Sequence, residues 1–120
     1  ASLPGKYAEP EGQILLAWAN GGGEEKLAGI VAMRPLEDDG ICELKRLYLR
    51  DEFRGQGAGR QLTEDIIYFA QKAGYEKMRL DTERRLQTAI DMYRKFGFVE
   101  IGQYYDNPMA QILYMEKQLN

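Results

Sequence analysis

The chain has 120 residues, a single cysteine, and 16 Lys and Arg against 19 Asp and Glu, which gives a formal net charge of −3. This length predicts one domain over residues 1–120, and the acidic balance argues against a nucleic-acid surface. One cysteine excludes an internal disulfide framework, and the lack of histidine excludes an imidazole base or ligand. No apolar run approaches the roughly 20 residues of a membrane helix, so we expect a cytoplasmic protein without a metal or a membrane partner.

Apolar runs and turn residues predict the elements in chain order. Residues 2–12 contain Pro-Gly and Pro-Glu-Gly and predict a loop. Strands are expected at 13–19, 27–33 and 41–49, a helix at 62–73, a strand at 75–80, a helix capped by Thr82 and stopped by Gly97, and strands at 98–104 and 110–117. The order β-β-β-α-β-α-β-β predicts an α/β (α+β) domain with a mixed, mostly antiparallel sheet and two helices.

The third strand sorts its side chains poorly. Strict alternation places Ile41, Glu43, Lys45, Leu47 and Leu49 on one face, and Cys42, Leu44, Arg46 and Tyr48 on the other. Both faces then mix polar and apolar groups, which is unusual for a half-buried strand. A β-bulge would re-aim these side chains, but the sequence leaves this open.

A glycine-rich segment, Arg54-Gly55-Gln56-Gly57-Ala58-Gly59-Arg60, joins the third strand to the first predicted helix. Glycines let the backbone approach a ligand, and the first N–H groups of a helix favour an anion such as phosphate. The spacing fails the dinucleotide and P-loop patterns but fits R-x-x-G-x-G. A glycine-rich turn without a ligand remains the alternative.

Three segments together resemble the GNAT superfamily of N-acetyltransferases, from about Gln13 to the C-terminus. They are the R-x-x-G-x-G loop, the strand Glu43–Leu49, which matches the central strand of the family, and Ala89–Phe98, which looks like its A-x-x-x-Y-x-x-x-G-F segment. The resemblance implies the GNAT fold, acetyl-CoA as cosubstrate, and transfer of its acetyl group to a primary amine by direct attack in a ternary complex.

The resemblance also implies a role for each matching residue. Glu43 would be the general base, and Tyr93 the acid that protonates the CoA thiolate. The cofactor would be bound by Leu47, Tyr48 and Leu49 along the strand and by Arg54, Gly55, Gln56, Gly57, Ala58, Gly59 and Arg60 at the pyrophosphate. The acceptor would be bound by Tyr104, Tyr105, Asp106 and Asn107.

Structural roles compete with these assignments. Glu43 could be a solvated strand carboxylate or a partner of Lys45 or Arg46. Tyr93 also lies on the apolar face of its helix and could merely pack, and residues 104–107 could form an ordinary Asx-Pro turn. Cys42 is interpreted as a core thiol, because no histidine is present to activate it.

Two departures from the family pattern bear on function. Leu86 stands where the family usually carries an asparagine that contacts the cofactor. About a dozen residues precede Gln13, where the family has a strand and two helices that form one wall of the acceptor pocket. We therefore expect an N-terminally truncated member and a homodimer formed through an uncovered sheet edge. The alternative function is a catalytically inactive CoA-binding or partner-binding module.

Overall fold

The computed structural model describes residues 13–21, 24–55, 57–105 and 111–120. Its strands are β1 (Gln13–Gly21), β2 (Glu24–Pro35), β3 (Ile41–Leu49), β4 (Lys77–Glu83), β5 (Val99–Ile101) and β6 (Ile112–Gln118). Its helices are α1 (Ala58–Lys72) and α2 (Gln87–Lys95), and a short 3-10 helix spans Asp51–Phe53. The predicted loop at residues 2–12 lies outside the described residues.

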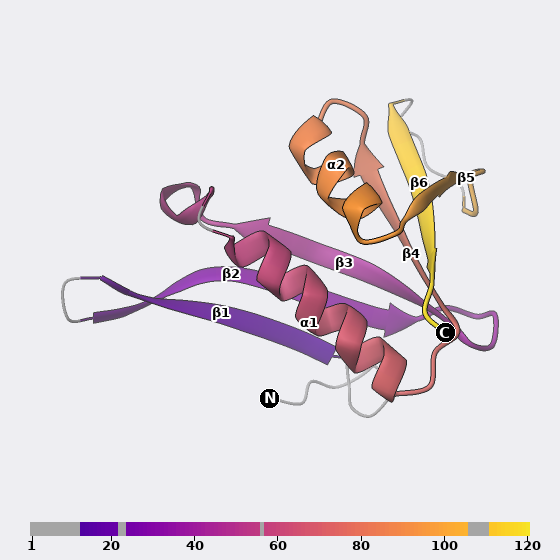
Figure 1. Ribbon diagram of the computed structural model, residues 1–120, viewed down its shortest axis with the longest axis horizontal. Helices are drawn as coiled ribbons and strands as arrows, with labels where there is room; N and C mark the ends of the chain where they lie inside the picture. The colour runs from indigo at the N-terminus through magenta and orange to yellow at the C-terminus, as the bar shows by residue number, and fades with distance from the viewer. Residues whose placement is uncertain (1–12, 22–23, 56, 106–110) are drawn as a thin grey trace.

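Within the described residues the strands form one sheet of six, in the order β1-β2-β3-β4-β6-β5. Neighbouring strands are antiparallel except for β3 and β4, which are parallel and joined through α1. Both helices lie on the same side of the sheet, α1 across β1, β2 and β3 and α2 beside β4 and β6 (Figure 1). The predicted mixed, mostly antiparallel sheet with two helices is confirmed.

Helix α1 follows its predicted apolar spacing. Leu62, Ile66 and Ala70 are buried against the sheet. The helix ends at Lys72, two residues before Gly74. The positive φ of 93° at Gly74 lets the N–H groups of Gly74 and Tyr75 bond the carbonyls of Gln71 and Ala70. The core therefore lies between the two helices and one face of the sheet.

The second helix starts later than predicted, and the strand before it is longer. Thr82 does not cap α2 but pairs with Leu113 inside β4, and Glu83 pairs with Ile112. Leu86 takes the N-cap position and makes no side-chain cap hydrogen bond. Pairing with β6 along the whole of β4 outweighs the capping preference of Thr82. The strand predicted at 98–104, in contrast, is shorter in the structure and spans Val99–Ile101.

A β-bulge in β3 corrects the alternation expected for this strand. Ile30 of β2 lies opposite Tyr48, whereas Ala32 lies opposite Lys45, so β3 carries one extra residue between these pairs. Leu47 and Leu49 therefore pack against the helix-side core, which also holds Cys42 and Leu44. Placing Leu47 and Leu49 on the same face as Glu43 and Lys45 was wrong, because an inserted residue reverses the alternation.

Close packing around Leu49 fixes the start of α1 against β3. A Cβ atom on Gly29 would lie 2.6 Å from Leu49 Cδ2 and 2.8 Å from the carbonyl oxygen of Tyr48. A Cβ atom on Gly59 would lie 3.0 Å from Leu49 Cδ1. Only hydrogen fits at these two positions without movement, so β2, β3 and the first turn of α1 are held closely together.

The packing around Leu49 predicts that Gly29→Ala destabilises the fold. The added methyl group meets a backbone carbonyl that cannot rotate away, and overpacking of this kind costs about 1–3 kcal/mol. The free energy of unfolding, measured with urea, should fall by that amount. Gly102→Ala is the matched control, since a Cβ atom at Gly102 meets nothing within 4 Å. Equal effects of the two substitutions would contradict this account of Leu49.

Candidate active site

Strands β3 and β4 pair only at one end. Within the described residues their ladder consists of Ile41 with Lys77, Cys42 with Met78, and Glu43 with Arg79. Beyond this point β3 continues beside β2 to Leu49, while β4 continues beside β6 to Glu83. Figure 1 shows the two strands separating from their shared end. One edge of β3 from Leu44 onward therefore faces a gap.

Backbone geometry assigns the groups that face this gap. The N–H of Arg50 donates to the carbonyl of Ala28 in β2 at 2.9 Å. Successive N–H groups of a strand point to opposite edges, so the N–H of Leu49 points toward the gap. The same alternation turns the N–H of Leu47 toward the gap and leaves the carbonyl of Tyr48 close to Gly29 of β2.

A cavity of about 370 Å³ fills the gap. Side chains of β3, β4, α2 and β6 line it, namely Leu44, Lys45, Leu47, Asp81, Thr82, Glu83, Leu86, Ala89, Tyr93 and Ile112. The fold thus brings the predicted Leu47 and Tyr93 together, although they are far apart in the sequence. Leu86, which replaces the asparagine of the family pattern, also lines this cavity.

Tyr93 enters the cavity from α2. Its side chain is buried and packs edge-to-face on Phe98, with ring centroids 5.7 Å apart. Burial, and secondly the nearby charge of Asp81, raises the pKa of Tyr93 to about 12. The phenol therefore stays protonated at neutral pH and can donate a proton. Tyr93 therefore both packs against Phe98 and lines the cavity.

The glycine-rich segment forms an uncapped helix start close to this gap. Gly55 and Gly57 have positive φ angles of 79° and 84°, and Gly57 is the N-cap of α1 without a side-chain cap hydrogen bond. The first turn of α1 contains no acidic residue, and Arg54 and Arg60 are exposed. An uncapped helix start beside two exposed arginines suits a bound anion. Gln56 lies outside the described residues.

Glu43 lies on the sheet face that the helices leave uncovered and is 1% exposed. Its Oε1 accepts a hydrogen bond from Arg34 Nε at 2.9 Å and lies 2.9 Å from Arg34 Nη2, while Tyr104 donates its hydroxyl to Oε2 at 2.5 Å. Lys45 Nζ lies 3.9 Å from Oε1. The alternative of a solvated carboxylate is therefore wrong. The alternative of a partner to Lys45 holds in part, and the side chain of Arg46 lies outside what is described.

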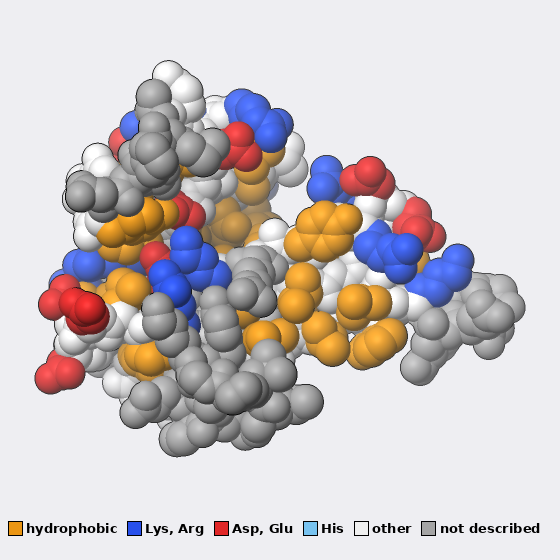
Figure 2. Space-filling view, turned by 180° about the vertical axis from the view of Figure 1, so that it is seen from behind, with side chains coloured by type: hydrophobic (Ala, Val, Ile, Leu, Met, Phe, Trp, Pro, Cys, Tyr) orange, Lys and Arg blue, Asp and Glu red, His pale blue; other side chains and the backbone are white. Residues whose placement is uncertain are grey.

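A second cavity, of about 430 Å³, opens beside Glu43 on this uncovered face. It is lined by Arg34, Pro35, Leu36, Glu37, Asp38, Glu43, Arg79, Tyr104 and Tyr105. Figure 2 views this side of the molecule, where charged side chains of both signs gather over one part and hydrophobic side chains over another. Glu43 and Tyr93 thus line different cavities, and Lys45 reaches from the first cavity toward Glu43.

Tyr104 and Tyr105 belong to a cluster of three aromatic rings with Tyr114. Their centroids are 5.2 to 5.6 Å apart, and all three pairs meet edge-to-face. Arg79 lies over the Tyr104 ring and Lys45 over the Tyr105 ring. Burial, followed by the hydrogen bond to Glu43, raises the pKa of Tyr104 well above its usual range. The predicted Asp106 and Asn107 lie outside the described residues.

Sequence reasoning missed the ion pair between Lys45 and Asp81. Lys45 Nζ of β3 lies 3.5 Å from Asp81 Oδ1 of β4, so the pair crosses the gap just beyond the last paired residues. It also missed Arg34, which holds Glu43. These contacts depend on strand order and register, and the only local signal was the presence of a charged residue on each strand.

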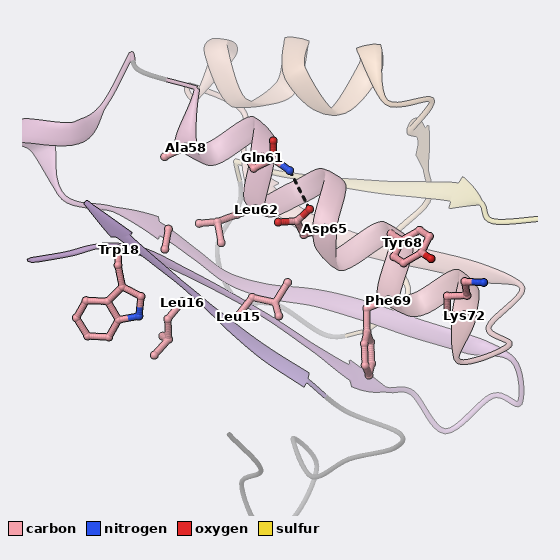
Figure 3. Close-up of a pocket in the computed structure, with 11 residues that line it drawn as sticks. Leu15, Leu16, Trp18, Ala58, Gln61, Leu62, Asp65, Tyr68, Phe69 and Lys72 are labelled. Atoms are coloured by element: carbon pink, nitrogen blue, oxygen red, sulfur yellow. Dashed lines mark hydrogen bonds between the residues drawn. The ribbon is translucent and has the colours of Figure 1, made fainter. Parts of the chain in front are cut away.

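A larger cavity, about 630 Å³, lies elsewhere among the described residues, between β1 and α1. Figure 3 shows Phe69 of α1 pointing toward the strands, whereas Leu16 and Trp18 point away from the helix. The lining of this cavity is mostly apolar. Of the predicted site residues, it includes Ala58 but neither Glu43 nor Tyr93. Size alone therefore does not identify the site, and the gap between β3 and β4 is the better candidate.

Two further findings concern Cys42 and the helices in the described part of the chain. Cys42 is fully buried, and burial raises the pKa of its thiol to about 12, which agrees with a core thiol. None of the described helices combines the length and the apolar character needed to cross a membrane.

Comparisons with known proteins bear on the family and the fold. The model of the Acetyltransferase (GNAT) family matches residues 3–98. An N-acetyltransferase of Schizosaccharomyces pombe is 39% identical over 115 residues, which cover 96% of this chain and 69% of that protein. Human N-acetyltransferase 8B is 34% identical over 95 residues, covering 75% of this chain and 41% of that protein. An acetyltransferase of Bacillus subtilis, solved in complex with CoA, has the same fold, with a TM-score of 0.72, 21% identity, and coverage of 90% of this chain and 77% of that one.

The contacts of Glu43 predict that Arg34→Met destabilises the fold. Loss of the cation leaves a buried carboxylate without its main partner, which costs about 3–5 kcal/mol at a fully buried site and about 2 kcal/mol here, because Arg34 is partly exposed. Arg85→Met is the matched control, because its pair with Glu83 is exposed and worth at most about 1 kcal/mol.

Urea unfolding of both variants measures the difference, and the double variant Arg34→Met/Glu43→Met should recover part of the loss, since it removes the unpaired charge. Equal stability of Arg34→Met and Arg85→Met would show that Glu43 does not depend on Arg34.

Proposed function

The chain belongs to the GNAT family of acetyltransferases, and on that premise we propose that it transfers an acetyl group from acetyl-CoA to a primary amine by direct attack in a ternary complex. The observation that carries the proposal is the gap between β3 and β4. It exposes one backbone edge of β3 and holds the protonated phenol of Tyr93. The chain spans 69% or less of the two relatives described above, so the activity of the whole protein is part of this proposal.

The cofactor binds along the glycine-rich segment and the gap. Arg54, Gly55, Gln56, Gly57, Ala58, Gly59 and Arg60 hold the pyrophosphate through the N–H groups at the start of α1 and the two arginines. A cavity of about 540 Å³ between α1 and α2, lined by Arg60 and Lys95 among others, supports placing the nucleotide end there. The pantetheine arm then runs into the gap beside β3.

Backbone groups of β3 act on the thioester. The N–H groups of Leu47 and Leu49 bind the pantetheine amides and the thioester oxygen, and Tyr48 between them sets their spacing. When the amine attacks, negative charge develops on that oxygen. Fixed N–H donors stabilise it, because they need no reorganisation at the moment of reaction.

Two side chains move protons. Glu43 accepts a proton from the acceptor's ammonium group through water, which leaves a free amine to attack the thioester. The transfer runs through water because Arg34 and Tyr104 already occupy the Glu43 oxygens and the adjacent cavity leaves room. Tyr93 donates its proton to the departing thiolate as the carbon–sulfur bond breaks. The acceptor approaches from the uncovered face, where Tyr104 and Tyr105 contact it, together with Asp106 and Asn107. The acids Glu37 and Asp38 beside this cavity favour a positively charged acceptor.

Turnover of variants tests these roles. Tyr93→Phe and Glu43→Gln should each lower kcat by about 10²–10⁴-fold against a panel of polyamines, amino acids and peptides with free N-termini. CoA should raise the Tm of the wild type by binding the folded state, and it should raise the Tm of both variants equally, because neither side chain binds the pyrophosphate. Tyr68→Phe on the exposed face of α1 is the control and should leave kcat unchanged.

Released CoA can be measured with a thiol reagent, since Cys42 is fully buried and its thiol pKa is about 12. The rate should not fall through loss of the acid until the pH nears the Tyr93 pKa of about 12.

A rise in Tm with CoA but no turnover of any amine would favour the inactive CoA-binding module. No rise in Tm would favour the partner-binding module, and full activity of Tyr93→Phe would remove its role as acid.

Two expectations about the context of the chain stay predictions. A homodimer is compatible with the position of β1 at the edge of the described sheet and with Trp18 being 58% exposed. The cytoplasmic location rests on the sequence alone.

A further inference from the structure

A primary amine of the chain itself lies at the mouth of the gap. Lys45 Nζ lies 3.5 Å from Asp81 Oδ1, 3.9 Å from Glu43 Oε1 and 5.5 Å from the centroid of the Tyr105 ring. Two carboxylates and an aromatic face form a suitable environment for an alkylammonium ion. The Lys45 side chain thus occupies the kind of site that an amine acceptor requires.

The position of Lys45 also brings it to the reacting groups. Lys45 lies two residues before Leu47 on β3, directly before the bulge. Both residues line the cavity that Tyr93 also lines. Asp81 reaches across from β4 into the same cavity. An acyl thioester held at Leu47 and Leu49 would therefore lie in the cavity that Lys45 lines.

We propose that Lys45 is an acetyl acceptor in cis, so that the chain acetylates its own Lys45 ε-amine when acetyl-CoA fills the gap. The inference rests on the proposed function and adds a modification site to it. Its basis is the geometry around Nζ, namely the two carboxylates, the ring face and the cavity shared with Tyr93.

The step balances with the groups at hand. The Lys45 ammonium gives a proton to Asp81, the nearer of its two carboxylates, whereas Glu43 already accepts hydrogen bonds from Arg34 and Tyr104. The free amine attacks the acyl carbon and forms the carbon–nitrogen bond, while the carbon–sulfur bond breaks. The thiolate takes a proton from Tyr93, and the second proton lost by the nitrogen returns through solvent to the Tyr93 phenolate. The products are Nε-acetyl-Lys45, CoA and the one proton that Asp81 received.

Lys77 provides a matched control within the same sheet. Its Nζ pairs with Glu116 Oε1 at 4.0 Å, and its side chain is 38% exposed against 26% for Lys45. Lys77 lines neither of the two cavities at the site. Uncatalysed acetylation should therefore favour Lys77, whereas acetylation within the gap should favour Lys45.

Mass spectrometry of the purified chain incubated with acetyl-CoA tests the proposal. Intact mass and peptide mapping should show acetyl groups on Lys45 before Lys77, at a rate that does not depend on protein concentration. Tyr93→Phe should slow modification of Lys45 by about 10²-fold or more and leave Lys77 unaffected. Asp81→Asn should also slow the modification of Lys45. Lys45→Arg removes the amine at this position, so that of the two sites only Lys77 should still be acetylated.

The Tm with and without CoA, measured on each variant, separates the possible failures. A rise in Tm with Lys45 unmodified, or with Lys45 modified no faster than Lys77, would overturn the inference and leave the proposed function standing. Equal modification of Lys45 in the wild type and in Tyr93→Phe would also overturn it, as chemical acetylation only. No rise in Tm in the wild type would refute the proposed function and the inference together.

Discussion

The loss of pairing between β3 and β4 after Glu43 and Arg79 is the constraint on which the rest of the site depends. Each strand keeps a partner on its other side, so the sheet stays whole while one edge of β3 is freed. The bulge in β3 then turns Leu47 and Leu49 toward the helices, where Gly29 and Gly59 leave room for Leu49. The gap, the exposed backbone and the start of α1 thus form one connected arrangement.

On the sheet face opposite the helices, charged contacts join the strands where the pairing of β3 and β4 ends. Arg34, Glu43 and Tyr104 connect β2, β3 and the segment after β5, while Lys45 and Asp81 join β3 to β4 across the gap. Burial makes each unpaired charge costly, so these groups stabilise one another's positions. In the proposed function, the acceptor side is therefore built from side chains, whereas the cofactor side is built mainly from backbone.

This division explains how far the sequence could predict the structure. Spacing and turn residues predicted the element order, the apolar face of α1 and its termination before Gly74, because those signals are local. The glycine segment was predicted as an anion site from its own residues, whereas Tyr93 was predicted from a family resemblance, and the structure places Tyr93 in the gap. The bulge in β3, the start of α2 after Leu86 and the Lys45–Asp81 pair depend on strand register, which one sequence does not specify.

The central claim is that the gap and the start of α1 hold one acyl-CoA molecule. Backbone amide NMR of the labelled protein, titrated with CoA, tests this claim most directly. We expect saturable shifts at Leu47, Leu49 and the amides of residues 57–60. Shifts confined to the larger cavity between β1 and α1, around Trp18 and Phe69, would contradict it, as would no shift at saturating CoA.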